Sequence, residues 1–232
     1  MSDDHPQRTT RRQDLLEVLV FLFLIVPSLA LSFFAVSQGS VSFALTAVTT
    51  ILRDLALVSL ILYFLWRNKE SLKSLGWTLN RFWRDVLIGL VLFVPLNLAV
   101  TYLDSFLQSI GFSAPSTPLP AAPATAGPGE LILALLLVVV VAISEETIFR
   151  GYLMLRFGRL TSSAAWAVVI SAAIFSLGHG YEGSSGVVTV GVLGAVYALI
   201  YVWRRSLTAP MVLHFLQDFV GIILLPLLGV GS

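Results

Sequence analysis

The sequence contains no cysteine and few charged residues, and each shortage excludes a class of function. Without cysteine the chain can form no disulfide bond, no thiolate metal site and no thiol nucleophile. Charged residues make up 12% of the 232 residues, whereas a soluble domain carries about 25%. The net charge of +1 provides no basic surface, so no nucleic-acid partner is expected. With 57% hydrophobic residues, the chain is predicted to be an integral membrane protein surrounded by lipid.

Long apolar runs predict an all-α, multi-pass bundle of about seven transmembrane helices, with six and eight as alternatives. A bilayer core needs about 20 apolar residues per helix, and several runs are near the lower limit. The first run follows a basic tail, residues 1–14, and is long enough to be a retained helix rather than a signal peptide. The predicted spans are Leu15–Val36, Val41–Trp66, Val86–Leu103, Leu131–Leu155, Ala164–Leu177, Gly186–Trp203 and Leu207–Leu228.

Basic residues occur in every second connection between these spans. Of the 14 Lys and Arg residues, 12 lie in the N-terminal tail, in segment 67–85 and in the turns after the fourth and sixth spans. By the positive-inside rule, this places the N-terminus in the cytoplasm. Segment 67–85 mixes basic and large apolar residues, so it is predicted to lie in the membrane interface. The Pro- and Ala-rich loop 104–130 is predicted to be extended and mobile on the outer side.

Several ionisable residues lie inside the apolar spans, where a charge is costly and by default marks a functional site. Glu146 and Arg150 are four residues apart on a helix and can pair, which would leave Glu145 free. A buried structural salt bridge is the alternative for Glu146 and Arg150, but it does not explain Glu145. We therefore expect Glu145 to have a functional role.

Two further spans carry histidines with the same spacing. His214 and Asp218 are four residues apart, so the carboxylate can orient the imidazole or act as a ligand beside it. A structural pair between helices is the alternative. Phe175 and His179 stand in the same relation at the end of the fifth span. At about 1.5 Å rise per residue, these residues and Glu145 lie at levels that agree within about two helical turns, so one polar site is feasible.

Two other pairs of charged residues are left outside this predicted site. Arg53 and Asp54 are adjacent, so we expect their side chains to project in different directions and to have structural partners on other helices. Asp14 and Glu17 lie in the first turn of the first span, where acidic residues suit the helix dipole. No function is expected for them.

Three motifs occur in order on three apolar segments: Glu-Glu-x-x-x-Arg at 145–150, Phe-x-x-x-His at 175–179 and His-x-x-x-Asp at 214–218. This part of the chain, residues 128–228, resembles the CPBP (Abi) family of CAAX proteases and bacteriocin-processing enzymes. Residues 15–127 carry membrane helices without a motif of that family. The resemblance implies an intramembrane endopeptidase whose substrates are membrane-associated peptides or lipidated proteins. The small size and short loops favour a bacterial member in the cell (inner) membrane, where the expected substrates are bacteriocin or signalling precursors.

The resemblance also implies a role for each motif residue. Glu145 would be the general base and would activate water together with His179. Glu146 and Arg150 would shape the site.

His214 and Asp218 would stabilise the oxyanion. The position of Asp218 is often Asn in the family, and an amide can donate to an oxyanion whereas an ionised carboxylate would oppose it. Asp218 would therefore be protonated, orient His214 or bind a metal. A metal-assisted alternative uses Glu145, His179 and His214 as ligands of a divalent ion such as zinc. The version without a metal is favoured slightly, because the signature His-Glu-x-x-His is absent.

Non-proteolytic functions form the main alternatives. The same fold could serve as a non-catalytic membrane scaffold or a bacteriocin-immunity protein. A transporter is the third possibility, because buried charges also line ion paths, and Arg53 and Asp54 would then take part. Serine and aspartyl intramembrane proteases fit less well, since the sequence lacks Gly-x-Ser-x-Gly and Gly-x-Gly-Asp.

Overall fold

All regular structure in the described part of the chain is helical, as predicted. The computed structural model describes residues 10–37, 42–115, 122 and 126–229; most of the N-terminal tail and nine residues of loop 104–130 lie outside these ranges. The described ends of that loop, 104–109 and 128–130, are helical and not extended as predicted. Each predicted span is a helical segment. The first three are α1 (Arg11–Ser37), α2 (Phe43–Arg67) and α3 (Phe82–Ser109), with the short helix η1 (Leu72–Leu75) before α3. The fourth is continuous through α4 (Pro128–Glu145), η2 (Glu146–Leu153) and α5 (Met154–Thr161).

The C-terminal half contains the remaining three segments. They are α6 (Ala164–Leu177), then η3 (Gly180–Glu182) with α7 (Gly183–Arg204), and finally α8 (Thr208–Asp218), η4 (Phe219–Leu224) and α9 (Leu225–Leu227). Within the residues that the structure describes, five segments are long and apolar enough to cross a membrane: 43–67, 82–109, 128–161, 180–204 and 208–227. At 14 residues, α6 is about 21 Å long and falls short of a bilayer core of about 30 Å.

Serine caps fix the starts of two helices. Ser42 accepts a hydrogen bond from the backbone N–H of Leu45 and begins α2, and Ser163 accepts one from Trp166 and begins α6. The predicted start of the fifth span at Ala164 therefore agrees with the structure.

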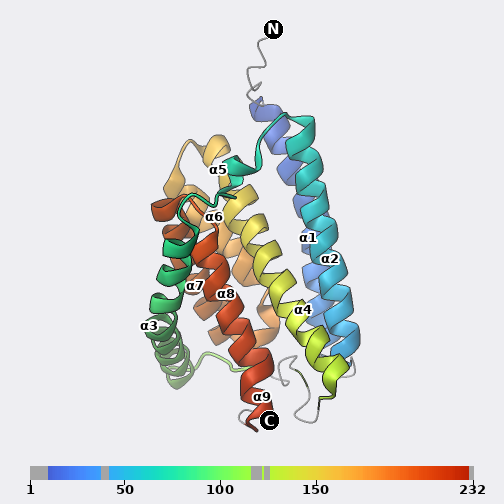
Figure 1. Cartoon of the computed structure of the whole chain (residues 1–232), viewed down its shortest axis with the longest axis vertical. Coiled ribbons are helices and arrows are strands. Elements are labelled where there is room, and N and C mark those ends of the chain that lie inside the picture. The colour runs from blue at the N-terminus through green and yellow to red at the C-terminus, as the bar shows by residue number, and fades with distance from the viewer. Residues whose placement is uncertain (1–9, 38–41, 116–121, 123–125, 230–232) are drawn as a thin grey trace.

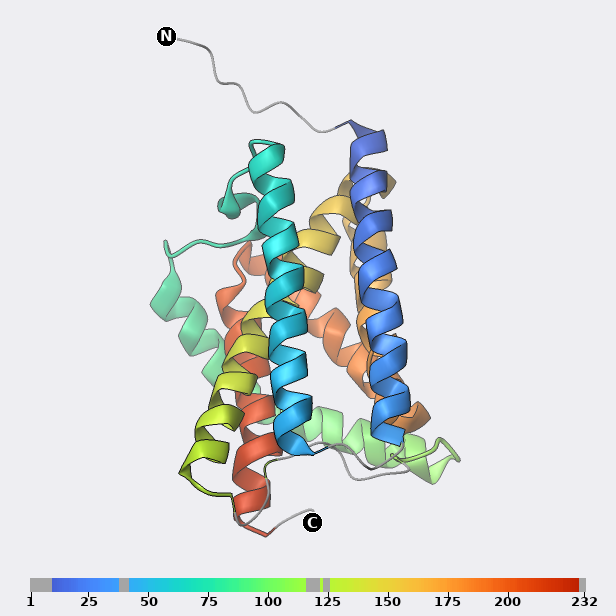
Figure 2. The same cartoon turned by 90° about the vertical axis from the view of Figure 1, so that its right-hand side faces the viewer.

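The third helix is longer than its apolar run. α3 continues past the predicted end at Leu103 to Ser109, because its last turns carry polar residues that a search for apolar runs does not register. Pro95 lies inside α3 and cannot donate a backbone hydrogen bond, which permits a bend. Figure 2 shows that the C-terminal part of α3 runs across the lower end of the bundle.

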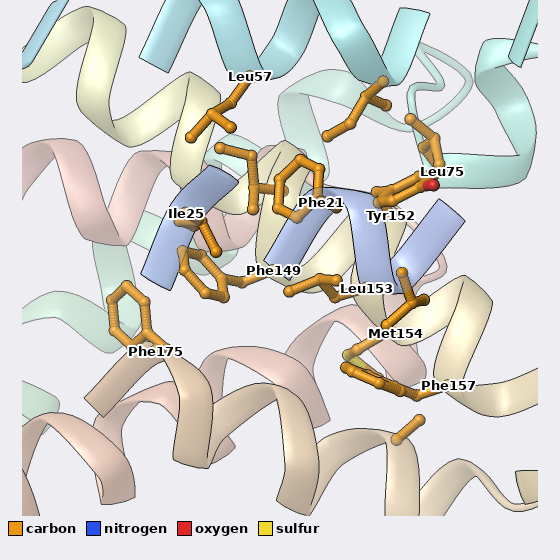
Figure 3. Packing of buried hydrophobic residues seen from close by; sticks show 14 of the residues in the cluster. Phe21, Ile25, Leu57, Leu75, Phe149, Tyr152, Leu153, Met154, Phe157 and Phe175 are labelled. Carbon is orange, nitrogen blue, oxygen red and sulfur yellow. The ribbon is translucent and has the colours of Figure 1, made fainter. Parts of the chain in front are cut away.

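The segment α4–η2–α5 runs through the middle of the bundle. α1 and α2 flank it on one side and α3 lies at the opposite edge (Figure 1). The largest apolar cluster joins α1, α2, η2, α5, α6 and α7. Phe21 and Tyr152 lie 5.5 Å apart between ring centres within it, and Phe149 belongs to the same cluster (Figure 3). Packing around η2 therefore fixes the segment that carries the first motif.

Two π-helical turns interrupt the ordinary helices. η2 begins at Glu146, directly after Glu145, and η4 begins directly after Asp218. Single π turns inside α-helices occur frequently at functional sites. Here η2 contains Glu146 and Arg150 of the first motif, and η4 starts directly after the last residue of the third motif.

A group of ion pairs joins α1, α2, α5 and the segment after α2 at the end of the bundle that carries the basic connections. Glu17 accepts hydrogen bonds from Arg67, Asn68, Tyr152 and Arg156. We call this group the basic-end network; its charged members are Asp14, Glu17, Arg67, Glu70, Arg156 and Arg159.

The basic-end network corrects two expectations from the sequence. Glu17 and Asp14 are buried and hold three helices together, rather than merely suiting the dipole of α1. Arg156, expected in the turn after the fourth span, lies inside α5, where it is fully buried and reaches Glu70 at 2.8 Å. Long-range packing, which the sequence does not display, buries this end of α5 against α1.

Candidate active site

Glu146 lies at the centre of the buried polar groups. Its Oε1 accepts a hydrogen bond from Arg150 Nη1 at 2.8 Å, so the predicted pair is present. The same oxygen lies 2.9 Å from His214 Nδ1. Because a carboxylate accepts hydrogen bonds, this contact places a proton on Nδ1 of His214. Glu146 therefore binds Arg150 and orients His214, which brings the first and third motifs together.

The other ring nitrogen of His214 faces two more carboxylates. His214 Nε2 lies 3.5 Å from Asp218 Oδ2 and 3.8 Å from Glu145 Oε2. Both distances are too long for good direct hydrogen bonds and leave Nε2 available to a reactant. Glu146, rather than Asp218, thus makes the hydrogen bond that orients the ring.

Arg53 and Asp54 belong to the same cluster, contrary to the expectation that left them outside it. Arg53 Nε donates to Asp54 Oδ1 at 2.8 Å, although adjacent residues were expected not to pair. Arg53 Nη2 also lies 3.7 Å from Glu145 Oε1. The long arginine side chain thus reaches both its neighbour and Glu145. Glu145 is therefore not free of cations; it faces Arg53 on one side and His214 on the other.

His179 approaches the cluster from the end of α6. Its Nδ1 lies 2.9 Å from the carbonyl oxygen of Phe175, and since a carbonyl can only accept, Nδ1 carries a proton. In the neutral ring, Nε2 is then left as an acceptor. Among the described residues, no ion pair or hydrogen bond joins Glu145 to His179. The ring of Phe175 contacts both imidazoles, with centroid distances of 4.7 Å to His179 and 6.2 Å to His214.

A glycine that the sequence analysis did not single out positions Arg150. The guanidinium of Arg150 lies 4.2 Å from the ring centre of Phe175 and 5.3 Å from that of Tyr197. Its Nη2 also donates to the carbonyl oxygen of Gly194 at 3.4 Å. A Cβ at Gly194 would stand 3.0 Å from Phe175 Cδ1 and 3.2 Å from Arg150 Nη2. A side chain at this position would force the Phe175 ring and the buried cation to shift by a few tenths of an ångström.

A cavity of about 350 Å³ opens beside the two histidines. Its walls come from α3, the end of α6, η3, α7 and α8. His179, His214 and Asp218 line it, whereas Glu145 is not among the lining residues. A small peptide segment placed there would lie against His179, His214 and Asp218.

Anionic groups outnumber arginines in this part of the molecule. We call the group the motif cluster; its members are Arg53, Asp54, Glu145, Glu146, Arg150, His214 and Asp218. Two arginines face four carboxyl groups in it. Three buried carboxyl oxygens have no hydrogen-bond partner: Oδ2 of Asp54, Oε2 of Glu145 and Oε2 of Glu146. Buried carboxyl oxygens normally have a hydrogen-bond partner, so three without one in a single cluster call for an explanation such as a bound water or a functional role.

The predicted metal ligands do not fit a metal ion as they lie. In the described ranges, no three His, Asp or Glu side chains are grouped so that they could hold one. Nδ1 of His214 is engaged by Glu146, and Nδ1 of His179 by a backbone carbonyl, so each ring could offer only Nε2. We therefore derive no step through a metal.

Comparison with known families supports the resemblance seen in the three motifs. Residues 127–220 match the family described as Rce1-like, type II CAAX prenyl endopeptidase. The match covers all six predicted site residues and confirms the CPBP-type assignment for this part of the chain. No curated protein and no solved structure matches the chain significantly. Arg53 and Asp54 lie outside the matched residues.

Proposed function

We propose that this chain is an intramembrane endopeptidase that hydrolyses peptide bonds of membrane-associated peptides with a water molecule activated by Glu145. The Rce1-like match of residues 127–220 supports a protease at the level of the family. The observation that carries the catalytic assignment is Oε2 of Glu145, which is buried and has no hydrogen-bond partner although it lies 3.8 Å from His214 Nε2. A water bound to one side of these two atoms could form a hydrogen bond with each of them.

In the proposed reaction, the water oxygen attacks the peptide carbonyl carbon while Glu145 takes one proton. The carbonyl oxygen becomes an oxyanion, which needs a hydrogen-bond donor. His214 can provide that donor through Nε2 when both of its nitrogens are protonated, because Glu146 accepts from Nδ1 and Asp218 faces Nε2. The intermediate collapses as the C–N bond breaks, and the proton on Glu145 passes to the leaving amine.

The neighbouring residues would position these groups. Arg53 Nη2, at 3.7 Å, would hold Oε1 of Glu145 and direct its other oxygen toward the water. His179 would accept a hydrogen bond from the water or the substrate through Nε2, because its Nδ1–H is bound to the carbonyl of Phe175. Membrane lipid surrounds the bundle, and the substrate would enter the site from the lipid or from the outer surface of the membrane.

Cleavage in a defined membrane tests this proposal. The purified chain is reconstituted in vesicles with a quenched fluorescent peptide that carries a membrane anchor, and products are identified by mass spectrometry. Glu145→Ala is expected to lower kcat/KM by a factor of about 10² to 10⁴ without loss of folding. If Glu145→Ala cleaves as fast as the parent chain, the catalytic assignment is wrong; if it retains the cellular phenotype of the parent, a scaffold is the better description.

Metal dependence is a separate measurement. The proposal requires no metal, so the active protein purified without added metal should contain no stoichiometric transition metal. A stoichiometric metal whose removal abolishes cleavage, and whose return restores it, would contradict this part of the proposal.

A further inference from the structure

We propose that the cavity beside His179 and His214 binds a positively charged side chain, lysine or arginine, of the substrate peptide. This proposal rests on the proposed peptidase function and specifies which peptides the site accepts. It is carried by two carboxylates and one unsatisfied hydroxyl in the cavity wall.

Asp104 of α3 and Glu182 of η3 line the cavity, and no lysine or arginine does. Asp104 accepts a hydrogen bond from Gln108 Nε2 at 2.8 Å through Oδ2. The side chain of Glu182 makes no hydrogen bond or ion pair with any residue that the structure describes. Both carboxylates are half-buried, so water screens them less than it would at an open surface.

The chain segments that surround these two carboxylates contain no lysine or arginine that could neutralise them. Residues 85–149 and 160–203 contain neither, and none follows Arg205. Glu182 interacts electrostatically with His179, whose Nδ1 is bound to the carbonyl of Phe175, so the ring is a cation only when Nε2 also carries a proton. While His179 is neutral, a cation from another molecule would be the partner of Asp104 and Glu182.

Thr189 supplies the independent observation that points to a ligand. Its side chain is 5% exposed and lines the cavity, yet Oγ1 has no hydrogen-bond partner in the described part of the chain. A hydroxyl oxygen can accept from an ammonium, which carries three donors, or from a guanidinium, which carries five. Buried hydroxyl groups are normally satisfied, so a bound group would complete this one.

The arrangement of α7 places these groups along one wall. Glu182, Gly186 and Thr189 follow at spacings of four and three residues and so share a face of the helix. A Cβ at Gly186 would stand 2.3 Å from Cβ of Glu182, so glycine leaves the space that the Glu182 side chain needs. Ser113 ties the loop after α3 to the start of α7, because its backbone carbonyl accepts from Ser185 N at 3.1 Å. This link holds the segments of Asp104 and Glu182 together.

The position of Glu182 close to His179 in the chain limits which residue of the substrate could bind to it. Glu182 N donates to the carbonyl oxygen of His179 at 2.9 Å, so both side chains leave the same turn. An extended peptide covers about 3.3 to 3.6 Å per residue, so three residues span about 10 Å. The charged side chain is therefore expected within about three residues of the scissile bond.

Peptides that differ only in charge test the proposal on the reconstituted full-length chain. A single lysine is moved through the three positions on each side of the scissile bond, and each peptide is compared with versions that carry leucine or glutamate there. At one position, kcat/KM is expected to be roughly tenfold higher for lysine than for leucine, and lowest for glutamate. Glu182→Gln and Asp104→Asn should each bring the lysine-to-leucine ratio toward one, and Glu182→Lys should favour the glutamate peptide.

A matched control removes a different carboxylate from the same end of the bundle. Glu130 is exposed in the first turn of α4, away from the cavity lining, so Glu130→Gln should keep the ratio of the parent chain. Equal rates for lysine, leucine and glutamate peptides in the parent chain would overturn the proposal. An unchanged ratio in both Glu182→Gln and Asp104→Asn would overturn it as well.

Binding separates this proposal from the peptidase function. The same peptides are titrated onto Glu145→Gln in lipid nanodiscs and followed by fluorescence anisotropy. If the parent chain cleaves none of them but Glu145→Gln binds the lysine peptide more tightly in a Glu182-dependent manner, the cavity proposal holds and the peptidase function fails. If the parent chain cleaves the peptides but neither cleavage nor binding depends on their charge, the peptidase function holds and the cavity proposal fails.

Discussion

The basic-end network and the motif cluster are both buried groups of carboxylates and arginines, but they differ in the ratio of arginines to carboxylates. The basic-end network sets three arginines against three carboxylates, and each carboxylate is engaged by at least one arginine. The motif cluster sets two arginines against four carboxyl groups and leaves three carboxyl oxygens without a hydrogen bond. The first arrangement suits the joining of helices, and the second keeps groups available for protons and water.

This difference teaches how to distinguish structural from chemical charges inside a membrane bundle. Burial alone does not separate them, because Glu17 and Glu146 are both almost fully buried. What differs is the partner count: Glu17 accepts from several donors through both oxygens, whereas Oε2 of Glu146 has none. Substitutions in the basic-end network should therefore lower stability without changing turnover, whereas substitutions in the motif cluster should lower turnover.

Removing the central cation of the basic-end network should have the largest effect. Arg156→Leu leaves Glu17 and Glu70 without their shared partner, and breaking a buried pair typically costs about 3 to 5 kcal/mol. We expect a marked drop in unfolding temperature in detergent, while kcat/KM per folded molecule stays at the parent value. A loss of turnover in folded Arg156→Leu would remove the distinction between the two groups.

Glu146→Ala should affect both stability and turnover, because Glu146 belongs to the site but carries structural contacts. The change leaves Arg150 without its ion-pair partner and releases Nδ1 of His214. We expect a loss of about 3 kcal/mol in unfolding free energy and no measurable cleavage. Denaturant unfolding and the vesicle assay measure the two effects. Intact turnover in this variant would show that His214 does not need Glu146 for orientation.

Arg53→Gln should reduce turnover more than it reduces stability. The change removes the cation 3.7 Å from Glu145 but keeps a hydrogen-bond donor near Asp54. We expect kcat to fall roughly tenfold, about 1.4 kcal/mol in the barrier, with KM little changed. Arg67→Gln serves as a matched control, because it removes an arginine from α2 in the basic-end network. Equal effects of both changes on kcat would show that Arg53 is only structural.

Asp218→Asn should have the smallest effect, within about threefold in kcat/KM. An amide at this position can donate to the oxyanion, and Glu146 keeps His214 oriented through Nδ1. Asp218→Ala is the variant to compare, because it removes the carboxylate and offers no hydrogen-bond donor in its place. It should be slower than Asp218→Asn. If Asp218→Asn is as slow as Asp218→Ala, the carboxylate itself is required.

The sequence predicts contacts within one helix better than contacts between helices. Helical spacing identified the pair Glu146–Arg150, which is hydrogen-bonded, and placed Asp218 beside His214, although at 3.5 Å Asp218 does not orient the ring. The approach of Arg53 to Glu145 depends on how α2 packs against α4, which no spacing shows.

Local geometry that depends on packing also escaped prediction. The burial of Arg156 and the π turns after Glu145 and Asp218 have no signature in apolar runs. The helix ends were predicted best where a capping serine marks them, as at Ser163, and worst where polar turns extend the helix, as in α3.

Glu145→Gln provides the most direct test of the difference between the two groups, with kcat/KM and unfolding temperature measured on the same reconstituted sample. The amide cannot take a proton from water, and the change removes one of four carboxylates that repel one another. We predict that kcat/KM falls by a factor of about 10² to 10⁴ while the unfolding temperature is unchanged or higher. Full turnover, or a loss of turnover accompanied by a lower unfolding temperature as in the basic-end network, would contradict the assignment of Glu145 as the base.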